Sequence, residues 1–126
     1  MKENHSPQAG FTLIEIMIVV MLIGLLACIA VPQWVHARTT SQTNTCINNL
    51  RQIEAAKAQW ALETKQATNS VPLYTDISSY LKSNVTCPAA GPGTTFGTSY
   101  LINNLNVKAA CQIYPVTHAL PQDTPN

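Results

Sequence analysis

The most unusual chemical group in the sequence is one carboxylate inside a long apolar segment. From Phe11 to Val31 the chain is almost entirely hydrophobic, and Glu15 is the only charged side chain in that stretch. A carboxylate near the centre of a bilayer costs roughly 2.5 to 3.5 kcal/mol or more, and a position near the end of the segment reduces this cost without removing it. Glu15 therefore calls for a partner.

Other reactive combinations are sparse. The three histidines, His5, His36 and His118, share no ligand spacing with a cysteine or a carboxylate, so the sequence predicts no metal site and no cofactor. We find no motif that predicts an enzyme. The seven lysines and arginines are scattered along the chain and form no basic stripe, so nucleic acid is not an expected partner.

The apolar segment around Glu15 predicts a membrane helix. Hydrophobic residues make up 46% of the chain and charged residues 10%, and the excess lies in this one run. A helix from Phe11 to Val31 would be roughly 30 Å long, which matches a bilayer core. An ordinary secretory signal peptide is disfavoured, because no small-residue cleavage site follows Val31 and Lys2, offset by Glu3, is the only basic residue before the run.

The helical pattern continues beyond the apolar run. No glycine or proline occurs from Gln33 to Val71, and four large apolar residues recur at helical spacing: Ile47, Leu50, Ile53 and Trp60. We therefore expect one helix from about Phe11 to Thr64, with its second half packed on a small head domain. In the head we expect a short helix that starts at Thr75 or Asp76 and runs through Leu81, with Ile77, Tyr80 and Leu81 facing inward.

Two strands are expected near the end of the head. The residues from Thr95 to Ile102 and from about Val107 to Tyr114 have strand character, and the asparagine-rich segment between them predicts a hairpin. A two-stranded sheet is marginal by itself, so it must lean on the long helix.

The four cysteines fall into two environments. Cys28 lies in the apolar run, whereas Cys46, Cys87 and Cys111 lie beyond it, where an exported domain would meet an oxidising compartment. Three cysteines allow three single pairs. We favour a disulfide between Cys87 and Cys111, because both lie in loop-rich sequence while Cys46 lies in a strongly helical stretch.

The segment Gly10-Phe11-Thr12-Leu13-Ile14-Glu15 resembles the cleavage and methylation motif of type IV prepilins and type II secretion pseudopilins. The resemblance implies a peptidase that cuts after Gly10 and methylates the new amino terminus at Phe11. It also implies that Glu15 acts in assembly by meeting the terminal amine of a neighbouring subunit. Gly24 and Pro32 match family positions where the helix can loosen when subunits pack.

The expected protein is an α+β, pilin-like chain with three parts: a leader over residues 1–10, a transmembrane and polymerisation helix over 11–32, and a head over 33–126. The resemblance implies a homopolymer with related pilins, a prepilin peptidase, and an inner-membrane assembly platform with a secretory ATPase. We expect a single-pass inner-membrane protein whose head lies on the periplasmic or extracellular side. The sequence leaves a pilus and a type II secretion pseudopilus open.

Two further expectations concern ligands. The chain lacks an acidic C-terminal loop that could hold calcium, since Asp123 is the only carboxylate available there, so a calcium role is not expected. The alternative function is a monomeric, membrane-anchored binding module that uses the prepilin motif only for processing. Exposed aromatic or basic clusters in the head would favour that alternative, and the sequence shows none.

Overall fold

A computed structural model describes residues 10–82 and 85–121. Residues 1–9 of the expected leader, and Asp123 in the tail, lie outside the described residues. The chain divides into two compact units, Met1–Ala37 and Arg38–Asn126.

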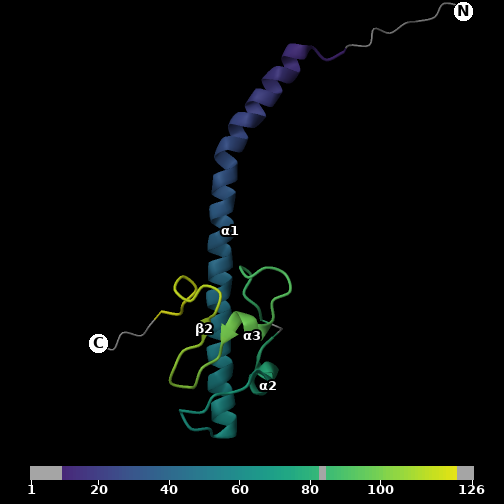
Figure 1. Cartoon of the computed structure of the whole chain (residues 1–126). Coiled ribbons are helices and arrows are strands. Elements are labelled where there is room, and N and C mark those ends of the chain that lie inside the picture. Colours follow the sequence, from purple (N-terminus) through teal and green to yellow (C-terminus); the bar gives the residue numbers. More distant parts are fainter. Residues whose placement is uncertain (1–9, 83–84, 122–126) are drawn as a thin grey trace, which may run out of the picture. The chain divides into compact units, whose positions relative to one another are not determined.

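Helix α1 runs from Leu13 to Thr64 and confirms the expected long helix (Figure 1). Thr12 caps its start, because its hydroxyl and carbonyl oxygens both accept hydrogen bonds from the Glu15 N–H, at 3.4 and 3.2 Å. Pro32 lies inside the helix. The helix ends where Lys65 adopts a φ of 50°, a left-handed conformation that commonly stops an α-helix.

The second half of α1 supplies one side of the head's core. Its buried residues recur every three or four positions, as one face of a helix requires: Cys46, Leu50, Ile53, Ala56 and Lys57. Of the expected apolar stripe, Leu50 and Ile53 are fully buried, while Ile47 and Trp60 are partly buried. The prediction that this half of α1 packs on the head is therefore confirmed.

The short helix of the head is present but starts earlier than expected. Helix α2 spans Tyr74–Ile77 and continues into a 3₁₀ turn at Ser78–Tyr80. The prediction that Thr75 or Asp76 caps it is confirmed in part: Leu73, not either of these residues, holds the N-cap position, but its backbone N–H donates to the Asp76 carboxylate at 2.9 Å. The Asp76 carboxylate thus caps the helix from a position within its first turn.

The inward face of this segment was predicted largely correctly. Ile77 is fully buried, and Leu81 is 9% exposed. Tyr80 is only partly buried, and its hydroxyl donates to the Glu63 carboxylate on α1.

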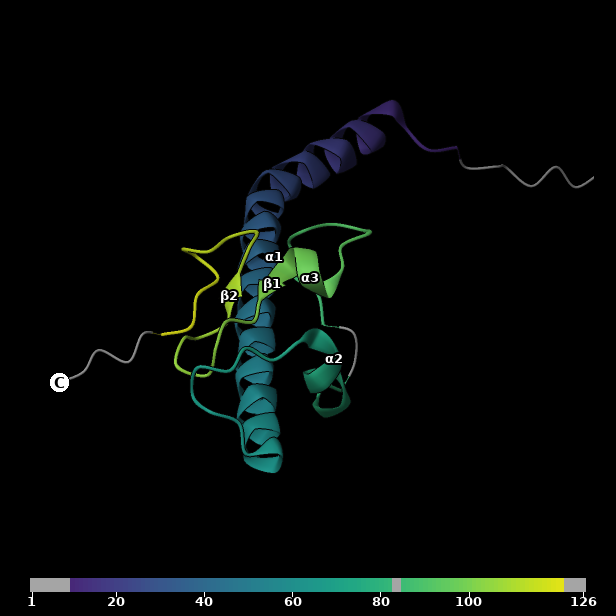
Figure 2. The same ribbon diagram turned by 60° about the horizontal axis from the view of Figure 1, so that its bottom comes forward.

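The hairpin is confirmed, but its strands are much shorter than predicted. Strand β1 is Tyr100–Leu101 and strand β2 is Ala110–Cys111; they pair antiparallel, with Tyr100 opposite Cys111 (Figure 2). A strand beginning at Thr95 is wrong, because helix α3 occupies Phe96–Ser99. The Thr95 N–H donates to the Thr98 hydroxyl at 3.1 Å, so this short turn satisfies its own backbone.

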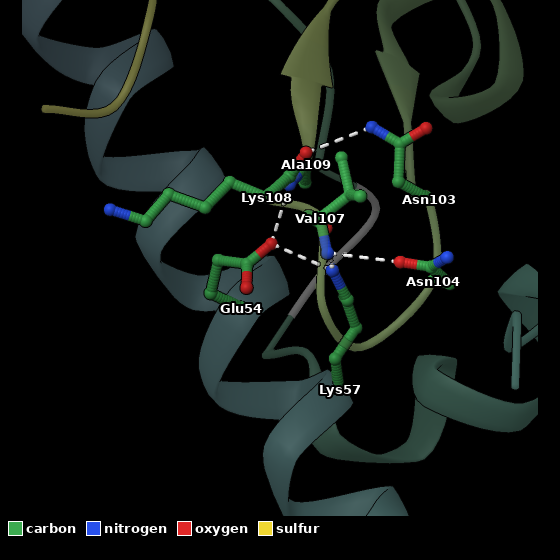
Figure 3. Close-up of polar contacts among 7 residues, drawn as sticks. All are labelled: Glu54, Lys57, Asn103, Asn104, Val107, Lys108 and Ala109. Carbon is green, nitrogen blue, oxygen red and sulfur yellow. Dashed lines mark hydrogen bonds and ion pairs between the residues drawn. The ribbon is translucent and has the colours of Figure 1, made fainter. Parts of the chain in front are cut away.

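The connection between β1 and β2 is fixed to α1 by buried polar contacts (Figure 3). Lys57 on α1 donates to the Val107 carbonyl at 2.9 Å, and the Glu54 carboxylate accepts from the Ala109 N–H. Within the connection, the Asn103 side chain donates to the Lys108 carbonyl at 2.8 Å. The marginal hairpin thus leans on the long helix as expected.

Candidate assembly interface and a buried cysteine and histidine cluster

The N-terminal half of α1 presents a continuous apolar surface. Every residue from Phe11 to Val35 is exposed, and an 18-residue window of the helix has a mean hydropathy of 2.9 with none of it buried. Soluble monomers rarely expose apolar patches larger than a few hundred Å². By length and composition this segment can cross a membrane, and together with the motif around Gly10 it fits membrane anchoring.

Glu15 lies in the first turn of α1, at the amino end of this surface. A carboxylate there interacts favourably with the positive end of the helix dipole, by typically 0.3 to 1 kcal/mol at an exposed site. Phe11, the expected new amino terminus, is 81% exposed and precedes the helix. Within a chain, the expected terminal residue therefore lies four positions before Glu15 and outside the helix.

The other expected assembly residues lie along the same exposed surface. Gly10 is exposed and lies outside helical structure, as a site of proteolysis would have to be. Gly24 has open space where a Cβ would stand, and Pro32 lies within the helix without ending it. Loosening of the helix between Gly24 and Pro32 in an assembled state stays a prediction.

A second group of functional side chains lies inside the head. Four buried residues offer ligand atoms that all lie within 4.8 Å of one another: Cys46, Cys87, Cys111 and His118. We call them the Cys₃His cluster. Their sulfur and nitrogen atoms come from α1, from the loop before α3, from β2 and from the turn after β2. All four cysteines are unpaired in the structure, and Cys28 is exposed on α1.

Sequence reasoning singled out Cys87 and Cys111 but missed the other two members of the cluster. The Cys87 and Cys111 sulfur atoms are 3.9 Å apart, so the favoured disulfide stays a prediction. Cys46 and His118 join them only through tertiary packing, and no short spacing in the sequence signals this. Burial raises the pKa of the Cys46 and Cys87 thiols and lowers the pKa of His118, so these three groups are neutral at pH 7.

Comparison with known proteins bears on the exposed apolar helix. The family described as "Prokaryotic N-terminal methylation motif" matches residues 5–31. A fimbrial protein of Pseudomonas aeruginosa is 40% identical over 63 residues, which are 50% of this chain and 41% of that protein. The type IV major fimbrial protein FimA of Dichelobacter nodosus is 44% identical over 62 residues, covering 49% and 40%.

A third relative belongs to a secretion system. The type II secretion system core protein G of Pseudomonas aeruginosa is 38% identical over 60 residues, covering 48% of this chain and 42% of that protein. The chain thus spans about two fifths of the length of these relatives, and no solved structure is significantly similar to it. In its N-terminal half, the chain is similar to type IV fimbrial proteins and to a type II secretion system core protein, and it carries the prokaryotic N-terminal methylation motif.

Proposed function

We propose that this protein is a structural subunit of a type IV pilus-like filament, without enzymatic activity. It is cleaved after Gly10 by a prepilin peptidase, methylated on Phe11 and polymerised through residues 11–32. The observation that carries the proposal is the position of Glu15, which lies within the methylation motif and is the only acid in the exposed apolar segment over residues 11–35.

The chemistry of assembly follows from that position. Cleavage after Gly10 gives Phe11 a free amine, which stays basic after N-methylation. In an apolar filament core the amine of one subunit can pair with the Glu15 carboxylate of the next, where salt screens the attraction little. Desolvation offsets much of the gain, but an unpaired charge in the core is strongly unfavourable. The pair therefore selects the register in which both charges meet.

The proposed life cycle has two stages. The subunit is first stored in the inner membrane by its apolar helix, with the head on the periplasmic or extracellular side. An assembly platform with a secretory ATPase then extracts it and stacks it on other copies and related pilins. The similar proteins include both fimbrial subunits and a secretion-system core protein, so the proposal covers both kinds of filament.

The test replaces Glu15 in cells that carry the assembly machinery. Glu15→Ala should leave membrane insertion intact, measured by membrane fractionation, yet block or badly slow filament formation seen by electron microscopy. Glu15→Asp keeps the charge and should restore part of the assembly. Normal filaments from Glu15→Ala would contradict the proposed role, and so would mass spectrometry that finds the leader still attached in assembled filaments.

A further inference from the structure

We infer that the head holds one structural Zn²⁺ ion, coordinated by the four side chains of the Cys₃His cluster. Zinc in structural sites is bound by four cysteine and histidine ligands in a closed tetrahedron, and Cys₃His is one of the common sets. All four residues are at most 4% exposed, which leaves no open position for a water or a substrate. The site is therefore structural, and it is separate from the helix surface used for assembly.

The distances match the size of a zinc tetrahedron. With Zn–S bonds of about 2.3 Å and Zn–N bonds of about 2.0 to 2.1 Å, neighbouring sulfurs lie about 3.8 Å apart and a sulfur lies about 3.5 Å from the nitrogen. The Cys87 and Cys111 sulfurs are 3.9 Å apart, and the Cys87 sulfur lies 3.7 Å from His118 Nδ1. All the ligand atoms lie within 4.8 Å of one another, so the most distant of them must move closer by about 1 Å at most to seat the ion.

The imidazole of His118 is held with its metal-binding nitrogen toward the sulfurs. The Thr43 hydroxyl donates its one hydrogen to the Thr39 carbonyl at 3.0 Å, and its oxygen lies 3.1 Å from His118 Nε2. Nε2 must then carry the proton and donate to Thr43, so Nδ1 has a free lone pair that faces Cys87. A second ring nitrogen fixed by a hydrogen bond is a usual feature of zinc-bound histidine.

The sulfur atoms also have donors around them that suit thiolates. The Tyr114 backbone N–H donates to the Cys111 sulfur at 3.5 Å, and, against the larger effect of burial, the Tyr100 hydroxyl acts to lower the pKa of the Cys46 thiol. The Asn49 side chain in turn donates to that hydroxyl at 3.0 Å, which leaves the hydroxyl hydrogen for the sulfur. On binding, the three thiols release their protons to solvent, and these donors help to stabilise the resulting negative charge.

Zinc would also explain how so small a head is held together. The ligands join α1, the loop at Cys87, strand β2 and the turn at His118, and Cys46, Cys87 and Cys111 are each separated from the next by more than 20 residues. Small domains with thin cores commonly depend on such a metal. A disulfide between Cys87 and Cys111 is the alternative to zinc binding by the same sulfur atoms. It would give Cys46 and His118 no role.

The test measures metal on the full-length chain, purified in detergent under reducing conditions. We expect about one zinc per chain by elemental analysis, and after exchange with Co²⁺ we expect the visible absorption of a tetrahedral cobalt site with thiolate ligands. Cys46→Ser and His118→Ala should each lose the metal. Cys28→Ser, which changes the exposed cysteine of α1, should keep it. Thr43→Val should weaken zinc binding by roughly 10- to 100-fold, because it removes the hydrogen bond that orients His118.

Two results would overturn the inference. One is a reduced wild-type chain that takes up neither Zn²⁺ nor Co²⁺ in a 1:1 complex. The other is peptide mapping of the chain purified without reductant that finds Cys87 joined to Cys111, Cys46 open to alkylation and no bound metal. Both measurements use the wild-type chain, so they decide the question even if the variants fail to fold.

Discussion

Replacing Lys57 with methionine would remove a charge that is almost completely buried in the head. Lys57 is 1% exposed, and its ammonium group donates to the Glu54 carboxylate and to the Val107 carbonyl, each at 2.9 Å (Figure 3). Methionine keeps most of the aliphatic stem in place. The change therefore isolates the polar contacts from the packing.

The loss of stability caused by Lys57→Met can be bounded from the surroundings of the Glu54–Lys57 ion pair. Removing one partner of a fully buried ion pair costs about 3 to 5 kcal/mol. The Glu54 side chain is 28% exposed, so water can replace part of the lost interaction, and we expect a loss of about 2 kcal/mol in the free energy of unfolding. At urea slopes of about 1 to 3 kcal/mol per M, the unfolding midpoint should fall by roughly 0.7 to 2 M.

The assay is urea unfolding of the full-length chain in detergent, followed by near-ultraviolet circular dichroism. Lys82→Met is the control, because Lys82 is exposed in the same unit of the chain, and it should shift the stability by no more than about 0.5 kcal/mol. A Lys57→Met midpoint that matches this control would refute the reasoning.

The double variant Glu54→Leu with Lys57→Met tests whether the ion pair also provides hydrogen bonds that neighbouring backbone groups need. Buried ion pairs that serve only each other can often be replaced by apolar residues without loss. Here Glu54 also accepts from the N–H of Ala109, a residue that is only 4% exposed. The double variant should therefore stay destabilised by at least about 1 to 3 kcal/mol, the cost of one unsatisfied buried donor. Wild-type stability in the double variant would contradict this account.

Two further pairs of variants test the core and a turn. Leu50→Ala should lower the free energy of unfolding by about 2 to 5 kcal/mol, because Leu50 is fully buried. Leu62→Ala, at a position 80% exposed, should change it by less than about 0.5 kcal/mol. Equal urea midpoints for the two variants would contradict the assigned core. Gly91→Ala should destabilise the head by about 1 to 2 kcal/mol, because Gly91 has a φ of 85°. Gly97→Ala in helix α3 should be neutral or stabilising. Thermal unfolding that ranks the two variants the other way would refute the argument from backbone conformation.

The long helix could be predicted because its signals are local and repeated. A run without glycine or proline from Gln33 to Val71, together with the spacing of Leu50 and Ile53, predicts that the helix continues past Pro32, and the structure confirms the predicted end at Thr64. The strands were overestimated because strand character in the sequence does not reveal a competing turn. At Thr95 and Thr98, hydrogen bonds between side chain and backbone cap the short helix α3 and favour it over a strand.

The buried cluster shows the limit of sequence reasoning for sites. Motifs are recognised when ligands are close in the chain, and Cys46 is separated from Cys87 by most of α1's second half and helix α2. His118 reaches the cluster through a turn in which its N–H donates to the Tyr114 carbonyl at 3.0 Å. Contacts of this kind depend on the tertiary packing of the head, which local sequence patterns do not encode.

Pro32 has a mechanical consequence for a polymer built from this chain. A proline has no N–H, so Pro32 cannot donate to the Cys28 carbonyl one turn earlier. The helix therefore has one hydrogen bond fewer at this turn to resist stretching. Under a pulling load along the helix axis, this turn would yield before its neighbours. An elastic joint of this kind would let each subunit absorb tension by lengthening locally while its head stays folded.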